Sequence, residues 1–196
     1  MRRRIIGLTG GIATGKSTVS DYLASQHELP VLDADVFSRE AVAKGSEILG
    51  RVRDRYGPNM LLVDGNLNRA QLGKIIFNDE AERQWLEQQI HPYVRDRFSQ
   101  ATDLFANSRV LVYSIPLLFE AKLTHLVTEV WVVACSPQQQ LKRLMARNQL
   151  ARADAQARID TQISLNEKCQ RADHVLDNSR ERDYLFSQID HLLKSV

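Results

Sequence analysis

The segment that most constrains the fold is a glycine-rich stretch near the start of the chain, residues 10–17, which reads GGIATGKS. An apolar run, residues 4–9, precedes it, and a segment of helical character begins near Ser17. The stretch fits the pattern GxxxxGK[ST] in the strand, loop and helix context that this pattern requires. In such a loop the backbone N–H groups bind phosphate oxygens, Lys16 neutralises phosphate charge and Ser17 offers an oxygen to Mg²⁺. The stretch therefore predicts a phosphate-binding loop rather than an ordinary turn.

Four further apolar runs alternate with segments of helical character, at residues 30–32, 110–113, 127–134 and 175–176. Strands separated by helices predict a parallel sheet, whose ligands bind beyond the carboxyl ends of the strands. We expect an α/β fold, a three-layer P-loop NTPase core with a five-stranded parallel sheet.

Two stretches between these strands are helical in character. Residues 35–107 show apolar residues at helical spacing and no strong strand, with a bend or boundary expected at His91–Pro92. Residues 137–170 are polar and rich in arginine. We expect a core made of residues 1–34, 108–136 and 171–196, with helical additions at 35–107 and 137–170.

Composition excludes several other classes of protein. The chain has 26 Lys and Arg against 24 Asp and Glu, too small an excess for a protein that binds nucleic acid mainly by neutralising phosphates. Cys135 and Cys169 form no CxxC and the histidines are scattered, so we expect neither a disulfide framework nor a zinc site. Residues 1–8 have the basic and apolar character of an export signal, but the apolar run meets Lys16 too early. We expect a folded cytoplasmic protein with no nucleic-acid or membrane partner.

Two aspartates follow the second apolar run. Asp33 would lie at the carboxyl end of the second strand, where a carboxylate can accept a proton from an attacking hydroxyl or hold a magnesium-bound water. Asp35 has an alternative role, as the N-cap of a helix that begins near Val36. Asp33 is our candidate for the catalytic base.

A run of arginines follows the fourth predicted strand. Arg143 and Arg147 are four residues apart, so on a helix they point the same way. In a phosphoryl-transfer enzyme such arginines stabilise transition-state charge, with an effect of about 10³- to 10⁵-fold. The alternative is an ordinary solvated helix face, which also applies to Arg152 and Arg158.

Taken in order, these features resemble the dephospho-CoA kinase family over nearly the full length of the chain. The resemblance also rests on residues 64–69, His91–Pro92, residues 116–120 (PLLFE), residues 140–147, Arg158 with Gln162, and residues 172–173 with Asn178. It implies ATP-dependent phosphorylation of the ribose 3′-hydroxyl of dephospho-CoA with Mg²⁺, the final step of coenzyme A biosynthesis.

The resemblance also implies roles for particular parts of the chain. Residues 35–107 would be a helical acceptor (CoA-binding) domain and residues 137–170 a helical lid. Asp33 and Lys16 would be catalytic, with Arg143 and Arg147 as lid arginines. The implied ATP-binding residues are Gly11, Ile12, Ala13, Thr14, Gly15, Lys16, Ser17, Thr18 and Asn178. Ser17 would also coordinate the Mg²⁺ that binds with ATP. The implied acceptor-side residues are Asp35, Arg69, His91, Pro116, Leu117 and Glu120.

Two positions depart from the expected pattern. The family usually has a glycine where this chain has Ala13, and a methyl group there restricts the loop if the residue needs positive φ. The third strand ends at Ser114 rather than at an aspartate, so a conventional Walker-B carboxylate is missing. We expect Mg²⁺ to rely on Ser17, ATP oxygens and water, with Asp33 or Asp35 as a further ligand.

Two alternative functions remain open from the sequence. Another small-metabolite kinase, of the shikimate or nucleoside-monophosphate type, shares the loop, a following aspartate and a lid, although the long stretch before residue 108 favours a large acceptor. A nucleotide-sensing switch is the other class, and the absence of an NKxD guanine-reading motif counts against it.

Overall fold

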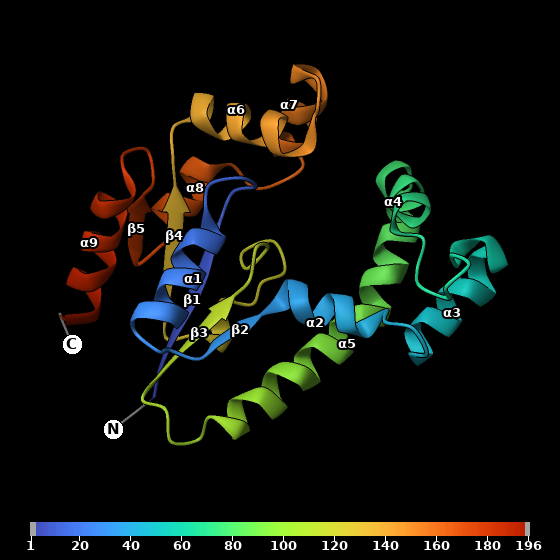
Figure 1. The fold of residues 1–196 in the computed structure, drawn as a ribbon, viewed down its shortest axis with the longest axis horizontal. Helices are drawn as coiled ribbons and strands as arrows, with labels where there is room; N and C mark the ends of the chain where they lie inside the picture. The colour runs from blue at the N-terminus through green and yellow to red at the C-terminus, as the bar shows by residue number, and fades with distance from the viewer. Residues whose placement is uncertain (1–2, 195–196) are drawn as a thin grey trace. The chain divides into compact units, whose positions relative to one another are not determined.

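The computed structural model describes residues 3–194, and residues 1–2 of the segment considered above as an export signal lie outside the described part (Figure 1). The chain forms two compact units. One is built from the chain up to Asp33 and from Asn107 onward, and we call it the core unit. The other, Ala34–Ala106, is called the insertion unit.

Among residues 3–194, no helix combines the length and the apolar character needed to cross a membrane.

The core unit is built on a parallel sheet of five strands in the order β2-β3-β1-β4-β5. The strands are β1 (Arg4–Gly10), β2 (Val31–Asp33), β3 (Val110–Ser114), β4 (Glu129–Ala134) and β5 (His174–Asp177). The inner positions of β1, β3 and β4 are mostly apolar and buried, as expected for strands with both faces covered, whereas Val175 in the edge strand β5 is 43% exposed. The prediction of an α/β fold with a five-stranded parallel sheet is confirmed.

The fourth strand begins two residues later than the sequence predicts. Residues 127 and 128 follow a short 3-10 turn, η2 (Thr124–Leu126), and lie outside β4. The Thr128 N–H still donates to the Ile5 carbonyl at 2.9 Å, but the Ile5 N–H donates to the Thr128 hydroxyl, at 2.8 Å, rather than to a backbone carbonyl. The regular ladder therefore starts at Glu129.

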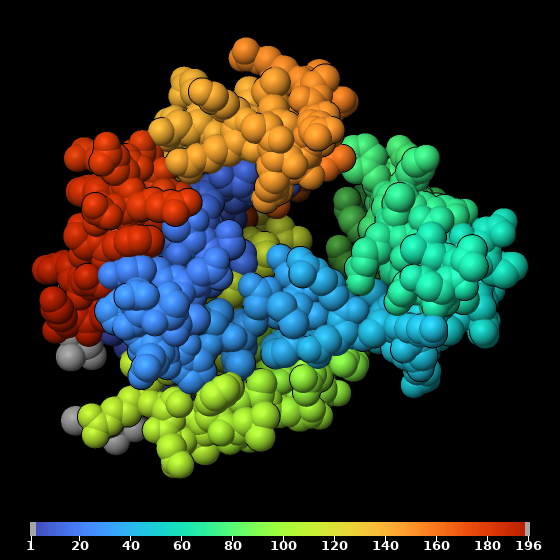
Figure 2. Space-filling model, viewed as in Figure 1, coloured from blue at the N-terminus to red at the C-terminus, as the bar shows by residue number. Residues whose placement is uncertain are grey.

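The α-helices described in the core unit are α1 (Lys16–Gln26), α6 (Pro137–Asn148), α7 (Arg152–Asp160), α8 (Leu165–Gln170) and α9 (Arg182–Lys194). Figure 2 shows the last helix, in red, lying against the N-terminal segment in blue. The rings of Tyr22 and Phe186 stack there at 3.9 Å, and the Tyr22 hydroxyl and His27 both contact Asp190. The main core includes Ile6, Leu8, Trp131, Val133 and Leu185, all completely buried.

The insertion unit is helical, with α2 (Ala34–Ala41), α3 (Glu47–Tyr56), η1 (Pro58–Met60), α4 (Arg69–Asn78) and α5 (Glu80–Leu104). Of the bend or boundary expected at His91–Pro92, the boundary is wrong, because α5 continues through Pro92. A proline removes one N–H donor from a helix, and here buried Leu86 and Phe98 hold the helix on either side of it.

The suggestion that Asp35 is an N-cap is also wrong. Helix α2 already begins at Ala34, so Asp35 lies within its first turn rather than before it. An acidic residue in the first turn still interacts favourably with the helix dipole.

Candidate active site

The glycine-rich segment forms a tight loop between β1 and α1, and two of its glycines are required by their surroundings. Gly15 has φ of 104°, and a Cβ built on it would lie 2.1 Å from the Asn178 side-chain nitrogen. That nitrogen donates to the Thr14 carbonyl at 2.8 Å. A Cβ on Gly10 would lie 2.7 Å from the Val133 carbonyl oxygen. Asn178, just after β5, thus supports the loop backbone directly.

Ala13 adopts a positive φ, the conformation in which a methyl group was expected to restrict the loop. Its φ is 61°, in the left-handed region that favours glycine. For an alanine this conformation costs about 1 kcal/mol. The neighbouring Thr14 is completely buried, and its hydroxyl donates to the Gly11 carbonyl at 2.9 Å, which stabilises the turn.

Lys16, Asp33 and Ser114 come together at the carboxyl ends of three strands. The Lys16 ammonium lies 3.4 Å from Asp33 Oδ2 and 2.5 Å from the Ser114 hydroxyl, and this hydroxyl donates to the same Asp33 oxygen at 2.7 Å. Ser114 is completely buried, whereas the other two side chains keep some exposure. The structure therefore places the predicted base, Asp33, beside the predicted phosphate-binding lysine, Lys16. Ser114 contacts both, although in the sequence it stood out only because it replaces an expected aspartate.

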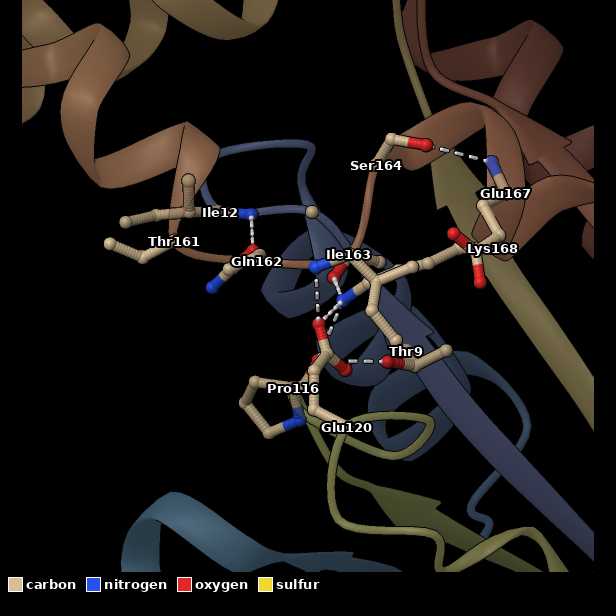
Figure 3. A network of polar contacts seen from close by, with 12 residues as sticks. Thr9, Ile12, Pro116, Glu120, Thr161, Gln162, Ile163, Ser164, Glu167 and Lys168 are labelled. Atoms are coloured by element: carbon tan, nitrogen blue, oxygen red, sulfur yellow. Dashed lines mark hydrogen bonds and ion pairs between the residues drawn. The ribbon is translucent and has the colours of Figure 1, made fainter. Parts of the chain in front are cut away.

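The backbone of Ile12 in the loop is held from two sides by residues of the segment 137–170. Its N–H donates to the Gln162 side-chain oxygen at 3.0 Å (Figure 3), and its carbonyl accepts from the Gln140 side-chain nitrogen at 2.9 Å. Gln140 is buried, and a Cβ on Gly11 would lie 2.6 Å from its nitrogen. Both glutamines lie in segments on which the family resemblance rests, but no role was predicted for either of them.

A completely buried lysine lies beneath the loop. The Lys168 ammonium is 2.8 Å from Glu120 Oε1 and donates to the carbonyls of Gly10 and Pro116 at 3.3 and 3.4 Å (Figure 3). The Ile163 N–H also donates to Glu120 Oε1, at 3.2 Å. Pro116 and Glu120, predicted on the acceptor side, are thus bound to α8, whereas Leu117 is 42% exposed. A lysine in a polar helical stretch carries no sequence signal for such burial.

The two arginines of α6 have different surroundings. Arg143 donates through Nη2 to the Asn178 carbonyl at 3.0 Å, and its buried Nη1 has no hydrogen-bond partner among residues 3–194. Burial raises the pKa of the nearby Cys135 thiol, against the opposing charge of Arg143. Arg147 is exposed, and its Nε donates to the side-chain oxygen of Asn148 at 2.9 Å. The unpaired Nη1 of Arg143 is the kind of donor that an anion satisfies.

The insertion unit contains a cavity of about 450 Å³. Its lining includes the predicted residues Asp35 and Arg69, together with Arg39, which the sequence analysis missed. Apolar side chains complete it, namely Val42, Leu67, Leu72, Ile76, Leu86 and Ile90. His91 is exposed on α5 and does not line this cavity. The cavity combines positive charge with an apolar wall.

The side chains at the loop suit a cation that arrives with a nucleotide. Within residues 3–194 there is no group of three or more His, Cys, Asp or Glu side chains that could hold a metal ion. Ser17, in the first turn of α1, and the Asp33 carboxylate offer oxygen ligands of the type that Mg²⁺ prefers. With so few protein ligands, phosphate oxygens and water would supply the rest.

The chain is similar to known proteins both in sequence and in fold. The family model described as "Dephospho-CoA kinase" matches residues 4–183. A dephospho-CoA kinase from Trichormus variabilis is 58% identical over 190 residues, covering 97% of this chain and 96% of the relative. The crystal structure of TT1252 from Thermus thermophilus superposes with a TM-score of 0.83 at 31% identity, covering 100% of this chain and 99% of that one.

The shikimate kinase alternative shares only the fold. Shikimate kinase from Acinetobacter baumannii, in complex with shikimate, superposes with a TM-score of 0.55 at 16% identity, covering 98% of this chain and 94% of that one. Identity is far higher to the dephospho-CoA kinase from Trichormus variabilis, and it extends over nearly the whole chain. The resemblance seen in the sequence is confirmed, and the chain is a kinase that belongs to the dephospho-CoA kinase family.

Proposed function

We propose that this chain transfers the γ-phosphoryl group of ATP to the ribose 3′-hydroxyl of dephospho-CoA, giving coenzyme A and ADP. The observation that carries the proposal is the contact of Asp33 and Lys16 at the phosphate loop, 3.4 Å apart, in a chain of this family. One group can accept the proton of an attacking hydroxyl, and the other can neutralise the phosphates it attacks.

The phosphate loop would bind ATP through its backbone. Backbone N–H groups of the loop and of the start of α1 would form an anion site, apart from the Ile12 N–H, which donates to Gln162. Lys16 would add a positive charge by turning from Asp33 to the β- and γ-phosphates. Ser17 would hold Mg²⁺, which when bound neutralises charge on the phosphate oxygens. Asn178 would keep Gly15 and Thr14 in the geometry that this site needs.

Asp33 would act as the general base. As the 3′-oxygen bonds to the γ-phosphorus, its proton passes to the Asp33 carboxylate, and the bond from that phosphorus to the β,γ-bridging oxygen breaks to release ADP. Arg143 would stabilise the charge that develops on the transferred group through its unpaired Nη1, and Arg147 would join it when residues 137–170 move as a lid.

Dephospho-CoA would bind to the insertion unit. Its diphosphate suits the guanidinium groups of Arg39 and Arg69, and its pantetheine arm suits the apolar wall of the same cavity. Asp35 lines this cavity and can accept a hydrogen bond from the acceptor.

Cys135 and Cys169 are both free thiols, which supports a reducing, cytoplasmic location.

The test is acceptor-dependent ADP formation by the purified chain with ATP and Mg²⁺. Dephospho-CoA is compared with no acceptor, AMP and shikimate, and the product is identified by mass spectrometry. A gain of one phosphate on dephospho-CoA alone is the expected result. Phosphorylation of shikimate or AMP instead, or ATP binding with no acceptor-dependent product, would contradict the proposal.

A further inference from the structure

We propose that Ser114 is a positioning residue for phosphoryl transfer, whose hydroxyl orients Asp33 and Lys16 as a pair. The inference rests on the function proposed above, because these two groups serve there as the base and the phosphate-binding lysine. Ser114 ends β3, the position at which a Walker-B carboxylate would be expected. A neutral hydroxyl therefore occupies the point between an acidic and a basic side chain.

The backbone places this hydroxyl accurately. Strand β3 lies between β2 and β1, and Ser114 pairs in register with Asp33 on one side and with Leu8 on the other. Its side chain is completely buried. A residue enclosed by two hydrogen-bonded neighbours in the middle of a sheet has little freedom to move, so its Oγ is a fixed point for its partners.

The chemistry of the three groups sets the direction of both hydrogen bonds. An ammonium only donates and a carboxylate only accepts, whereas a serine hydroxyl has one proton to donate. Ser114 Oγ must therefore accept from Lys16, at 2.5 Å, and donate its single proton to Asp33 Oδ2, at 2.7 Å. Both bonds involve a charged group, which makes each of them stronger than a bond between neutral groups.

The distances show which partner holds the carboxylate. Asp33 Oδ2 lies 2.7 Å from Ser114 Oγ but 3.4 Å from the Lys16 nitrogen, so the hydroxyl makes the closer contact. Lys16 can then turn to the phosphates of ATP while Ser114 still donates to the same carboxylate oxygen. In this way the base keeps one orientation while Lys16 moves to the phosphates.

The test distinguishes the effect of the Ser114 hydroxyl on turnover from the effect of the size and shape of the side chain. Ser114→Ala should lower kcat roughly 10- to 100-fold, the effect of losing a hydrogen bond to a charged group, and should leave KM for ATP within about twofold. Ser114→Thr and Ser114→Val have nearly the same shape, and only the first keeps a hydroxyl. We expect the threonine variant to retain most of its turnover and the valine variant to lose it as the alanine variant does.

Ser20→Ala is the matched control, because Ser20 is also a buried serine, and its hydroxyl donates to a backbone carbonyl of its own helix, that of Ser17, at 2.9 Å. It should leave kcat unchanged. Equal turnover of the threonine and valine variants, or a change in KM for ATP with no change in kcat, would overturn the role of Ser114. Failure of the unmodified chain to phosphorylate dephospho-CoA would instead contradict the proposed function.

Discussion

The buried ammonium of Lys168 and the carboxylate of Glu120 form an ion pair of 2.8 Å between α8 and the segment that follows β3. The same ammonium donates to the carbonyl of Gly10, where the phosphate loop begins. Lys168 is completely buried and the Glu120 side chain is 20% exposed, so the pair is largely removed from water. A pair in this setting stabilises the fold only while both partners are present.

Removal of one partner of this pair should destabilise the chain more than removal of both. We expect Lys168→Met to lower the free energy of unfolding by about 3–5 kcal/mol, because the Glu120 charge is left without its partner. The double variant Lys168→Met/Glu120→Gln should recover part of that loss. Urea denaturation of the two single variants and the double variant measures the coupling. Strictly additive losses would show that the pair does not act as a unit.

Substitution of the candidate base should separate turnover from ATP binding. Asp33→Asn keeps the size of the side chain but removes the proton acceptor, so kcat should fall by about 10²- to 10⁴-fold with ATP affinity nearly unchanged. Lys16→Ala should lower both the turnover and the affinity for ATP, because the ammonium binds the phosphates. Calorimetric titration of ATP alongside steady-state kinetics measures the two effects. Near-normal turnover of Asp33→Asn would remove Asp33 from the mechanism.

Two glycines should respond in opposite ways to the same substitution. Gly15→Ala places a methyl group 2.1 Å from the Asn178 nitrogen at a φ of 104°, so we expect a loss of at least about 2 kcal/mol in stability, together with loss of ATP binding. Gly50 lies inside α3 with nothing within 4 Å of a built Cβ. Gly50→Ala should therefore stabilise the chain by about 0.5–1 kcal/mol. Thermal unfolding measures both changes, and a neutral Gly15→Ala would contradict the close packing of Asn178.

The insertion unit should contain an acid-sensitive contact between α3 and α5. The Arg55 guanidinium binds both oxygens of Glu82, at 2.7 and 2.8 Å, and the Tyr56 hydroxyl donates to one of them at 2.5 Å. The bond from Arg55, then that from Tyr56, lowers the pKa of Glu82 from 4.5 to about 2. Because this pKa is lowered on folding, the contact stabilises the protein above about pH 4.5 and loses its effect as the pH falls toward 2.

This contact can be measured by comparing unfolding across that pH range. Glu82→Gln should be less stable than the unmodified chain at pH 7, and the difference should shrink steadily between about pH 4.5 and 2. Tyr56→Phe removes one of the two donors to Glu82 and should give a smaller difference over a narrower range. A difference that stays constant from pH 7 to pH 2 would show that the carboxylate charge is not responsible.

Much of the core unit could be predicted because its signals are local. The glycine-rich loop, the short apolar runs and the aspartate after the second run all lie within a few residues of the structure they form. The errors occurred where tertiary contacts overrode a local preference. Packing of Leu86 and Phe98 carries α5 through Pro92, and the Thr128 hydroxyl accepts the Ile5 N–H before β4 begins.

The sequence by itself determined that this chain has a phosphate-binding loop in a parallel α/β core, because loop, strand and helix patterns depend on neighbouring residues. Only the tertiary structure decided which distant side chains meet. Ser114 stands 98 positions from Lys16 and Lys168 stands 158 from Gly10, yet each pair is in hydrogen-bond contact. Strand order, register and burial create these contacts, and no local pattern encodes them, so the partners of the loop could be found only in the folded chain.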